Sequence, residues 1–251
     1  GMTGKFHTSW GDFHSLKNQA ALEYECFRML SFGFACSIGD QLEPNGKLNP
    51  YTYKLIGKVY SQIKDREEWA RPSEAVVEAA VITSENPLYE SRIPDSIMGA
   101  AQMLEELAIQ FDIIDKEAVL DNYRLVILPD DLIVTEDFQK KLESYVEKGG
   151  KIISCGKGGL SENDRYPECF GTEHLGQIDK FPDFVIPEGK MAEGLDEGNE
   201  YVIYQRGEKI KPVAATTILE ACAPYFSREG EYFCSHSYTP SAKGERYPAA
   251  V

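Results

Sequence analysis

Two polar turns near the start of the chain carry residue types that could bind or cleave a sugar. Trp10 and Asp12 lie in the first turn, and Asp40 lies in the second. A sugar ring offers an apolar face that stacks on an aromatic side chain, and hydroxyls that donate to carboxylates. Asp12 and Asp40 are therefore candidate catalytic residues. The candidate substrate-binding residues are His7, Trp10, His14 and Gln41. The alternative places Trp10 in a core and makes the aspartates turn or helix caps, and spacing alone favours neither interpretation.

A second candidate is Cys155, which ends a strand-like segment before Gly156-Lys157-Gly158-Gly159. A nucleophilic cysteine needs a histidine base and an acid that orients it. The later histidines, His174 and His236, stand in no His-x-Glu context, and a structural histidine is the favoured interpretation of His236. An inert buried thiol is therefore preferred at Cys155. The glycine turn lacks GK[ST] and precedes acidic residues, so it indicates a structural turn rather than a phosphate loop.

The cysteines give no sign of a metal site or a disulfide framework. All six are scattered without CxxC spacing, which is typical of reduced thiols in a cytoplasmic protein. The sequence predicts no metal and no cofactor.

The charge excludes two classes of partner. The net charge is −15, whereas nucleic acids and anionic membranes are bound by basic patches. No apolar run approaches the ~20 residues of a membrane-spanning helix, and no secretion signal opens the chain. We expect a cytoplasmic protein with no nucleic-acid or membrane partner.

Residues 1–72 are predicted to hold two strand–helix units. The strands are expected at 5–10 and 34–38, with helices capped by Asn18 and Asn49 and Gly33 ending the first helix. Two parallel strands cannot bury both faces alone. The apolar helix faces, at 22–30 and 55–63, are therefore expected to be covered by a second domain or another subunit.

Residues 73–251 restart the alternation. Strands are expected at 79–83, 111–115, 123–128 and 151–155. Asp95 or Ser96 and then Thr135 are expected to cap the intervening helices, the first with Ile97, Ala101, Leu104 and Ala108 facing inward. This pattern predicts an α/β fold with an open, flavodoxin-like parallel sheet. Further strands are expected near 184–186, 201–204 and 211–214, and a helix near 217–223.

The first region resembles a known family. Segments 3–13, 21–28 and 36–41 resemble the last strands and helices of a (β/α)₈ barrel. That barrel belongs to glycoside hydrolases related to family-42 β-galactosidases and to a group of α-L-fucosidases. Segments 123–159 and 225–236 resemble the β-galactosidase trimerisation domain, a class I glutamine amidotransferase-like α/β fold without amidotransferase chemistry. The resemblance implies two β/α units at 1–72 and a trimerisation domain, truncated at its C-terminus, at 73–251.

The resemblance implies a C-terminal fragment of a glycoside hydrolase of the β-galactosidase or α-L-fucosidase type, with a carbohydrate partner in the parent protein. The larger domain would serve oligomerisation, as a homotrimer or homodimer. The family's general acid comes from a mid-barrel strand, and the first motif has no Glu where family-42 enzymes carry their nucleophile. The chain is therefore expected to lack a complete active site, and whether it is an enzyme stays open. The alternatives are a non-catalytic assembly or ligand-binding module, and a Cys-dependent amidotransferase-like hydrolase that uses Cys155.

Overall fold

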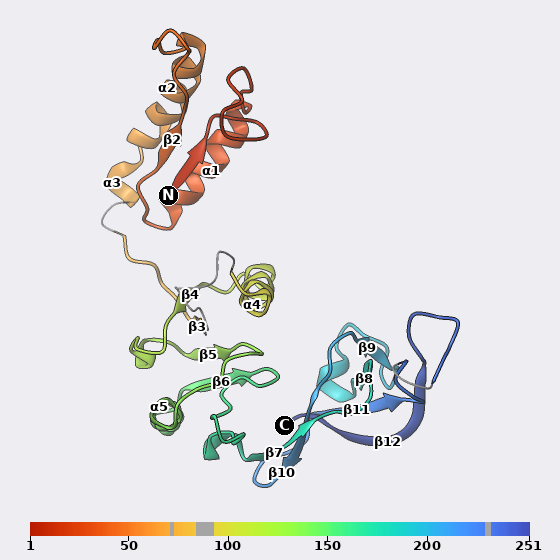
Figure 1. Cartoon of the computed structure of the whole chain (residues 1–251). Coiled ribbons are helices and arrows are strands. Elements are labelled where there is room, and N and C mark those ends of the chain that lie inside the picture. Colours follow the sequence, from red (N-terminus) through yellow and green to blue (C-terminus); the bar gives the residue numbers. More distant parts are fainter. Residues whose placement is uncertain (71–72, 84–92, 229–231) are drawn as a thin grey trace. The chain divides into compact units, whose positions relative to one another are not determined.

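The structure, a computed structural model, describes residues 1–70, 73–83, 93–228 and 232–251. The chain divides into two compact units, Gly1–Val76 and Val77–Val251, whose helices and strands are labelled in Figure 1. Each unit has its own hydrophobic core. The predicted domain boundary after residue 72 falls beside residues that lie outside the described part of the chain. No described helix is long and apolar enough to cross a membrane.

The first unit is built on a pair of short parallel strands, β1 (Met2–Gly4) and β2 (Ser37–Gly39). The strand expected at 5–10 is wrong, because pairing ends when the Lys5 N–H donates to the Gly39 carbonyl and the chain then turns. The strand expected at 34–38 begins three residues later. The N–H of Phe34 donates back to Met29 at the end of the preceding helix, so this segment completes a helix end instead.

The helices of this unit begin where their caps predict. Helix α1 (Gln19–Ser31) follows Asn18, whose side chain accepts from Ala21 N–H, and Gly33 takes a left-handed φ of +72° after it. Helix α2 (Pro50–Lys64) follows Asn49, with Pro50 in its first turn. A short helix, α3 (Glu67–Ala70), comes next.

The two long helices bury their apolar faces on each other. The shared core consists of Leu22, Cys26 and Leu30 from α1 with Val59 and Ile63 from α2. Ile38 of β2 packs against the same cluster. The expectation that these faces need a second domain or subunit to cover them is therefore wrong.

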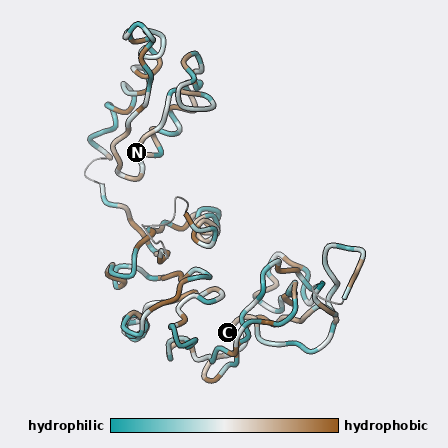
Figure 2. The backbone as a smooth tube through the Cα atoms, viewed as in Figure 1, coloured by the Kyte–Doolittle hydropathy of each residue, from teal (hydrophilic) through white to brown (hydrophobic). Residues whose placement is uncertain are grey.

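The second unit begins with the predicted parallel sheet, which is confirmed. Its strands lie in the order β4-β3-β5-β6 and are all parallel. Their bounds are β3 (Ala79–Ile82), β4 (Phe111–Ile114), β5 (Leu125–Leu128) and β6 (Lys151–Ser154). The tube coloured by hydropathy shows brown along these central strands (Figure 2), in line with the complete burial of β3.

A helix covers each face of this sheet. Val81 and Ile127 pack with helix α4 (Asp95–Glu106) on one face, whereas Val126 and Leu128 pack with helix α5 (Glu136–Glu147) on the other. Alternate strand residues thus point to opposite helices. A short 3-10 helix, η1 (Leu120–Asn122), precedes β5.

The caps of these helices differ in how well they were predicted. Thr135 caps α5 as predicted, since its side chain accepts from Phe138 N–H. The N-cap of α4 is Pro94, not Asp95 or Ser96. Ala100 is buried in place of the predicted Ala101, and Ala108 lies beyond the helix end, exposed, at a φ of +54°.

The rest of the unit is antiparallel. Strands β7 (Thr172–Gln177) and β10 (Glu208–Pro212) pair, and β12-β11-β8-β9 form a second sheet. The bounds in that sheet are β8 (Asp183–Ile186), β9 (Tyr201–Ile203), β11 (Leu219–Pro224) and β12 (Ser241–Ala250). Two 3-10 helices are η2 (Glu168–Phe170) and η3 (Gly189–Ala192).

The helix expected at 217–223 is wrong, because β11 pairs with β8 on one side and β12 on the other. The overall α/β class is confirmed, as a mixture of parallel and antiparallel sheets. The flavodoxin-like and amidotransferase-like assignments stay predictions.

Candidate functional site

The candidate sugar residues lie on the loops that follow β1 and β2. Both strands run the same way, so their carboxyl ends meet at one edge, where barrel enzymes place their active sites. The backbone links the two ends directly, since the Lys5 N–H donates to Gly39 at 2.9 Å.

Two aromatic rings cover two glycines that pair across these strands. Gly4 and Gly39 are register partners. A Cβ on Gly4 would stand 2.9 Å from the Phe6 ring, and one on Gly39 would stand 2.2 Å from the Trp10 ring. The two rings also contact each other, with centroids 5.3 Å apart. Phe6 is buried, whereas Trp10 is 59% exposed and so presents an aromatic surface to solvent.

Asp40 lies next to Gly39 but is shielded. Its side chain is 7% exposed and pairs with the Lys5 ammonium, Nζ to Oδ1, at 3.5 Å. Neither carboxylate oxygen accepts a hydrogen bond from any residue that the structure describes. Lys5 is itself 2% exposed and also donates to the Phe13 carbonyl. A buried charge pair is costly unless good geometry and further hydrogen bonds compensate for the lost hydration.

The other predicted site residues are exposed on the loops. Asp12 accepts a hydrogen bond from Thr8 Oγ1 at 3.4 Å, and His7 uses its backbone N–H to bind Ser15 Oγ at 2.7 Å. His14 and Gln41 are exposed as well. The structure thus places the Trp10 ring on Gly39, the residue directly before Asp40. The remaining candidates lie in the same loops, and the hydrogen bonds described for Asp12 and His7 go to neither of these two residues.

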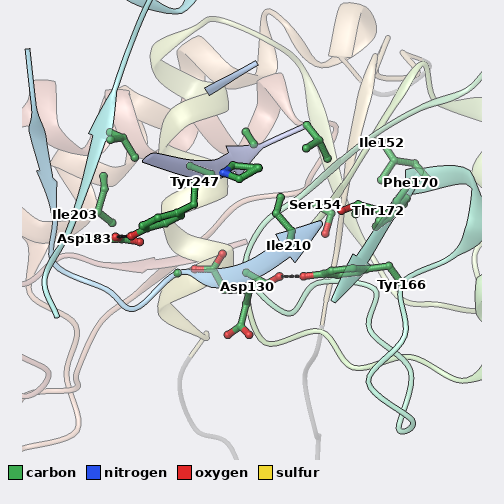
Figure 3. Close-up of a pocket in the computed structure, with 18 of the residues that line it drawn as sticks. Asp130, Ile152, Ser154, Tyr166, Phe170, Thr172, Asp183, Ile203, Ile210 and Tyr247 are labelled. Atoms are coloured by element: carbon green, nitrogen blue, oxygen red, sulfur yellow. Dashed lines mark hydrogen bonds between the residues drawn. The ribbon is translucent and has the colours of Figure 1, made fainter. Parts of the chain in front are cut away.

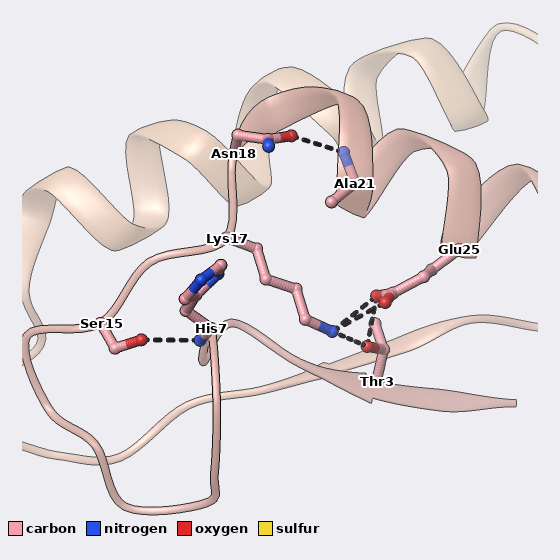
Figure 4. Close-up of polar contacts among 7 residues, drawn as sticks. All are labelled: Thr3, His7, Ser15, Lys17, Asn18, Ala21 and Glu25. Carbon is pink, nitrogen blue, oxygen red and sulfur yellow. Dashed lines mark hydrogen bonds and ion pairs between the residues drawn. The ribbon is translucent and has the colours of Figure 1, made fainter.

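Sequence reasoning missed Lys5, and it also missed a second polar network, which Lys17 forms between β1 and α1. The Lys17 ammonium donates to Thr3 Oγ1 and to both Glu25 oxygens at 2.8 Å, on the side of β1 that faces α1 (Figure 4). Burial alone would raise the pKa of Glu25, but the hydrogen bonds from Lys17 and Thr3 and the Lys17 charge bring it below its usual value. The sequence signal that pointed to Lys5 is its place directly before Phe6, which puts a charged residue inside a segment expected to be a strand.

The second unit contains a pocket of about 720 Å³ (Figure 3). Asp183 and Tyr247 lie at one side of it, Tyr166 at the other, and Asp130 between them. Tyr247 donates its hydroxyl to Asp183. Burial raises the pKa of Asp183, although hydrogen bonds from Tyr247 and from the Phe184 N–H partly oppose this. Burial and the neighbouring Asp131 likewise raise the pKa of Asp130.

A buried histidine lies beside this pocket. His174 Nε2 lies 2.8 Å from Glu208 Oε2, and both side chains are less than a tenth exposed. The ring of Tyr166 meets the His174 ring edge-on, and burial together with the Glu208 charge raises the pKa of Tyr166 to about 12. Because its Nε2 already pairs with Glu208, we interpret His174 as a structural residue.

Cys155 has the environment of an inert thiol. It is partly buried at the end of β6, and burial and the nearby Asp130 carboxylate raise its pKa. A nucleophilic cysteine needs the opposite shift, toward the thiolate. Within the described residues, no three His, Cys, Asp or Glu side chains are grouped so as to hold a metal ion.

Comparison with known proteins gives a consistent picture. The family model of the β-galactosidase trimerisation domain matches residues 100–225. An α-L-fucosidase, isoenzyme 2 from Paenibacillus thiaminolyticus, is 34% identical with a TM-score of 0.89, over 98% of this chain and 38% of that one. No curated protein gives a significant match.

Two β-galactosidases share the fold at lower identity. The enzyme from Bacillus circulans sp. alkalophilus is 17% identical with a TM-score of 0.70, over 90% of this chain and 39% of its own. Gan42B, a GH42 β-galactosidase, is 16% identical with a TM-score of 0.68, over 90% of this chain and 37% of its own. The chain therefore spans less than two-fifths of the length of these solved structures.

Proposed function

Because this chain belongs to the β-galactosidase trimerisation domain family, we propose that it is the C-terminal part of a glycoside hydrolase of the α-L-fucosidase or β-galactosidase type. Residues 73–251 would hold copies of the protein together, and residues 1–72 would supply the last two β/α units of a (β/α)₈ barrel. The observation that carries this proposal is the 34% identity to the α-L-fucosidase over 98% of the chain.

The first unit has features that a barrel segment needs. Among the described residues its sheet consists of β1 and β2, and Ile38 of β2 packs on the core that helices α1 and α2 share, as in two consecutive β/α units. Unpaired outer edges of such a strand pair would find partners in a closed barrel. Trp10 would then lie at the barrel's carboxyl edge, the face that carries catalytic groups.

The residues at this edge suit sugar binding better than sugar cleavage. The exposed Trp10 indole offers a stacking face, and the exposed Asp12 carboxylate offers acceptors for hydroxyls. Hydrolysis needs two carboxyl groups about 5–9.5 Å apart, one on each side of the scissile bond. Since Asp40 is shielded by Lys5, Asp12 is left as the exposed carboxylate among the predicted residues. We therefore propose that this chain alone does not hydrolyse glycosides.

The larger unit suits self-association. It exposes large apolar side chains on its antiparallel part, among them Leu175, Val213, Ile218 and Tyr225, each at least half exposed. Its parallel sheet, with one helix on each face, supports a flavodoxin- and amidotransferase-like domain that works without a catalytic cysteine. We also propose a cytoplasmic location, based on six free, dispersed cysteines.

The test uses the purified chain with p-nitrophenyl α-L-fucoside and β-D-galactoside. We expect no release of p-nitrophenol above the buffer rate. Isothermal titration calorimetry with L-fucose and with D-galactose should show saturable binding that Trp10→Ala abolishes. Turnover of either glycoside by the chain would contradict the proposal that its active site is incomplete. Absence of sugar binding in a self-associating chain would favour the non-catalytic assembly module.

A further inference from the structure

Lys5 connects three parts of the first unit that would otherwise be independent. Its ammonium pairs with Asp40, directly after β2, and donates to the Phe13 carbonyl in the loop that carries Trp10. Its own backbone stands at the end of β1. A single buried side chain therefore ties both strand ends to the candidate sugar-binding loop.

The contact continues to Trp10 through one aromatic ring. The Lys5 ammonium lies 5.1 Å from the centroid of the Phe6 ring, a cation–π distance. Phe6 in turn contacts Trp10 and lies on Gly4, while Trp10 lies on Gly39. The Trp10 indole thus packs on Gly39 and on the Phe6 ring, and the Phe6 ring in turn contacts the Lys5 ammonium.

We propose that Lys5 is a positioning residue for Trp10: its pairing with Asp40 and Phe13 holds the loop closed and the indole over Gly39, ready to stack on a sugar. This inference rests on the proposed sugar site. Asp40 accordingly serves as the anchor for Lys5 and does not contact the sugar.

Burial makes the partners of the Lys5 ammonium important for the loop. A lysine that is 2% exposed loses its hydration, and among the described residues the Asp40 charge, the Phe13 carbonyl and the Phe6 ring compensate. These three partners belong to the end of β2, to the loop and to its first turn. Removal of the Lys5 ammonium breaks all three contacts at once and leaves Asp40 as a buried carboxylate without a charge partner. Because hydration of that carboxylate is then favourable, the loop that carries Trp10 is expected to move away from β2.

The experiment uses the full chain with Trp69→Phe, which leaves Trp10 as the sole tryptophan. Acrylamide quenching of its fluorescence, without sugar, measures how well Gly39 and Phe6 shield the indole. In Lys5→Met we expect the quenching constant to rise and the affinity for L-fucose or D-galactose to fall about tenfold, the loss of roughly one hydrogen bond to a charged group. Lys5→Arg, which keeps the charge, should restore much of both.

Lys17→Met is the matched control. It removes another ion-paired lysine next to β1, whose partners Thr3 and Glu25 lie away from the loop. It should lower stability and leave Trp10 quenching unchanged. If Lys5→Met does not fold, as judged by circular dichroism, Asp40→Asn replaces it and should also raise quenching.

Each outcome decides one claim. Unchanged quenching in a folded Lys5→Met chain, or an equal rise in Lys17→Met, would overturn the positioning role. If Lys5→Met raises quenching but the parent binds no sugar, the positioning role stands and the proposed sugar site fails.

Discussion

Trp10 rests on Gly39 so closely that no side chain could occupy that position without moving the ring. A Cβ added to Gly39 would stand 2.2 Å from the indole, well inside contact distance. Gly39 has no left-handed φ, so its backbone would accept another residue. The requirement for glycine comes from the indole, which links the end of β2 to the loop after β1.

Substitution of Gly39 tests this relationship directly. Gly39→Ala should push the indole away from β2, increase acrylamide quenching of Trp10 in a Trp69→Phe background, and weaken sugar binding. Gly57→Ala is the matched control, because a Cβ on Gly57, in the middle of α2, would meet no atom within 4 Å. A Gly39→Ala chain with unchanged quenching would contradict the close contact.

Helices α1, α2 and α5 were predictable because their cap signals are local. Asn18, Asn49 and Thr135 accept hydrogen bonds from backbone N–H groups two or three residues on, so the cap can be recognised from a short stretch of sequence. The four parallel strands were likewise visible as short apolar runs.

The errors lie where distant partners decide the structure. Segment 219–224 became a strand because β8 and β12, about 30 residues before and 20 after it, pair with both its edges. Residues 5–10 look like a strand, yet Lys5 turns inward to Asp40, 35 residues away. The two glycines under Phe6 and Trp10 gave no signal, since each looks like an ordinary turn or strand glycine in isolation.

The Lys17–Glu25 pair should make stability depend on pH. The pKa of Glu25 is lowered in the folded chain, so its contribution to the unfolding free energy is present above the unfolded value, near 4.5, and is lost as pH falls through the folded value. Glu25→Gln should lower the unfolding free energy at pH 7 by about 1 kcal/mol, because the pair is partly exposed.

Urea denaturation at pH 7 and pH 3 provides the measurement. The stability difference between the parent and Glu25→Gln should shrink toward zero at pH 3. An equal difference at both values would show that the carboxylate charge is not what stabilises the pair.

Asp183 should show the opposite trend. Burial raises its pKa above the unfolded value of 3.8, so the protonated form favours the folded state. Its contribution is largest below that value and is lost as pH rises through the folded pKa. Asp183→Asn keeps an acceptor for the Tyr247 hydroxyl and removes the charge.

The unfolding free energy of the parent, relative to Asp183→Asn, should therefore be higher near pH 4 than at pH 7. Guanidinium titrations of both proteins at the two pH values measure this. A relative stability that rises with pH would contradict the raised pKa.

Cys155 should react slowly. Burial and Asp130 raise its pKa, so little thiolate forms near neutral pH. Alkylation by iodoacetamide at pH 7.5, followed by peptide mass spectrometry, should modify Cys155 more slowly than it modifies glutathione. Asp130→Asn should speed the reaction. Faster alkylation than glutathione in the parent would revive the amidotransferase-like alternative.

The central claim is that this chain carries the self-association unit of a glycoside hydrolase. Multi-angle light scattering of the purified full chain at about 1–100 µM tests it most directly. Over this concentration range a stable oligomer keeps its mass, whereas a weak one dissociates on dilution. The proposal predicts a mass of two or three times the 28.1 kDa of one chain, independent of added sugar. A mass of one chain at every concentration would contradict it.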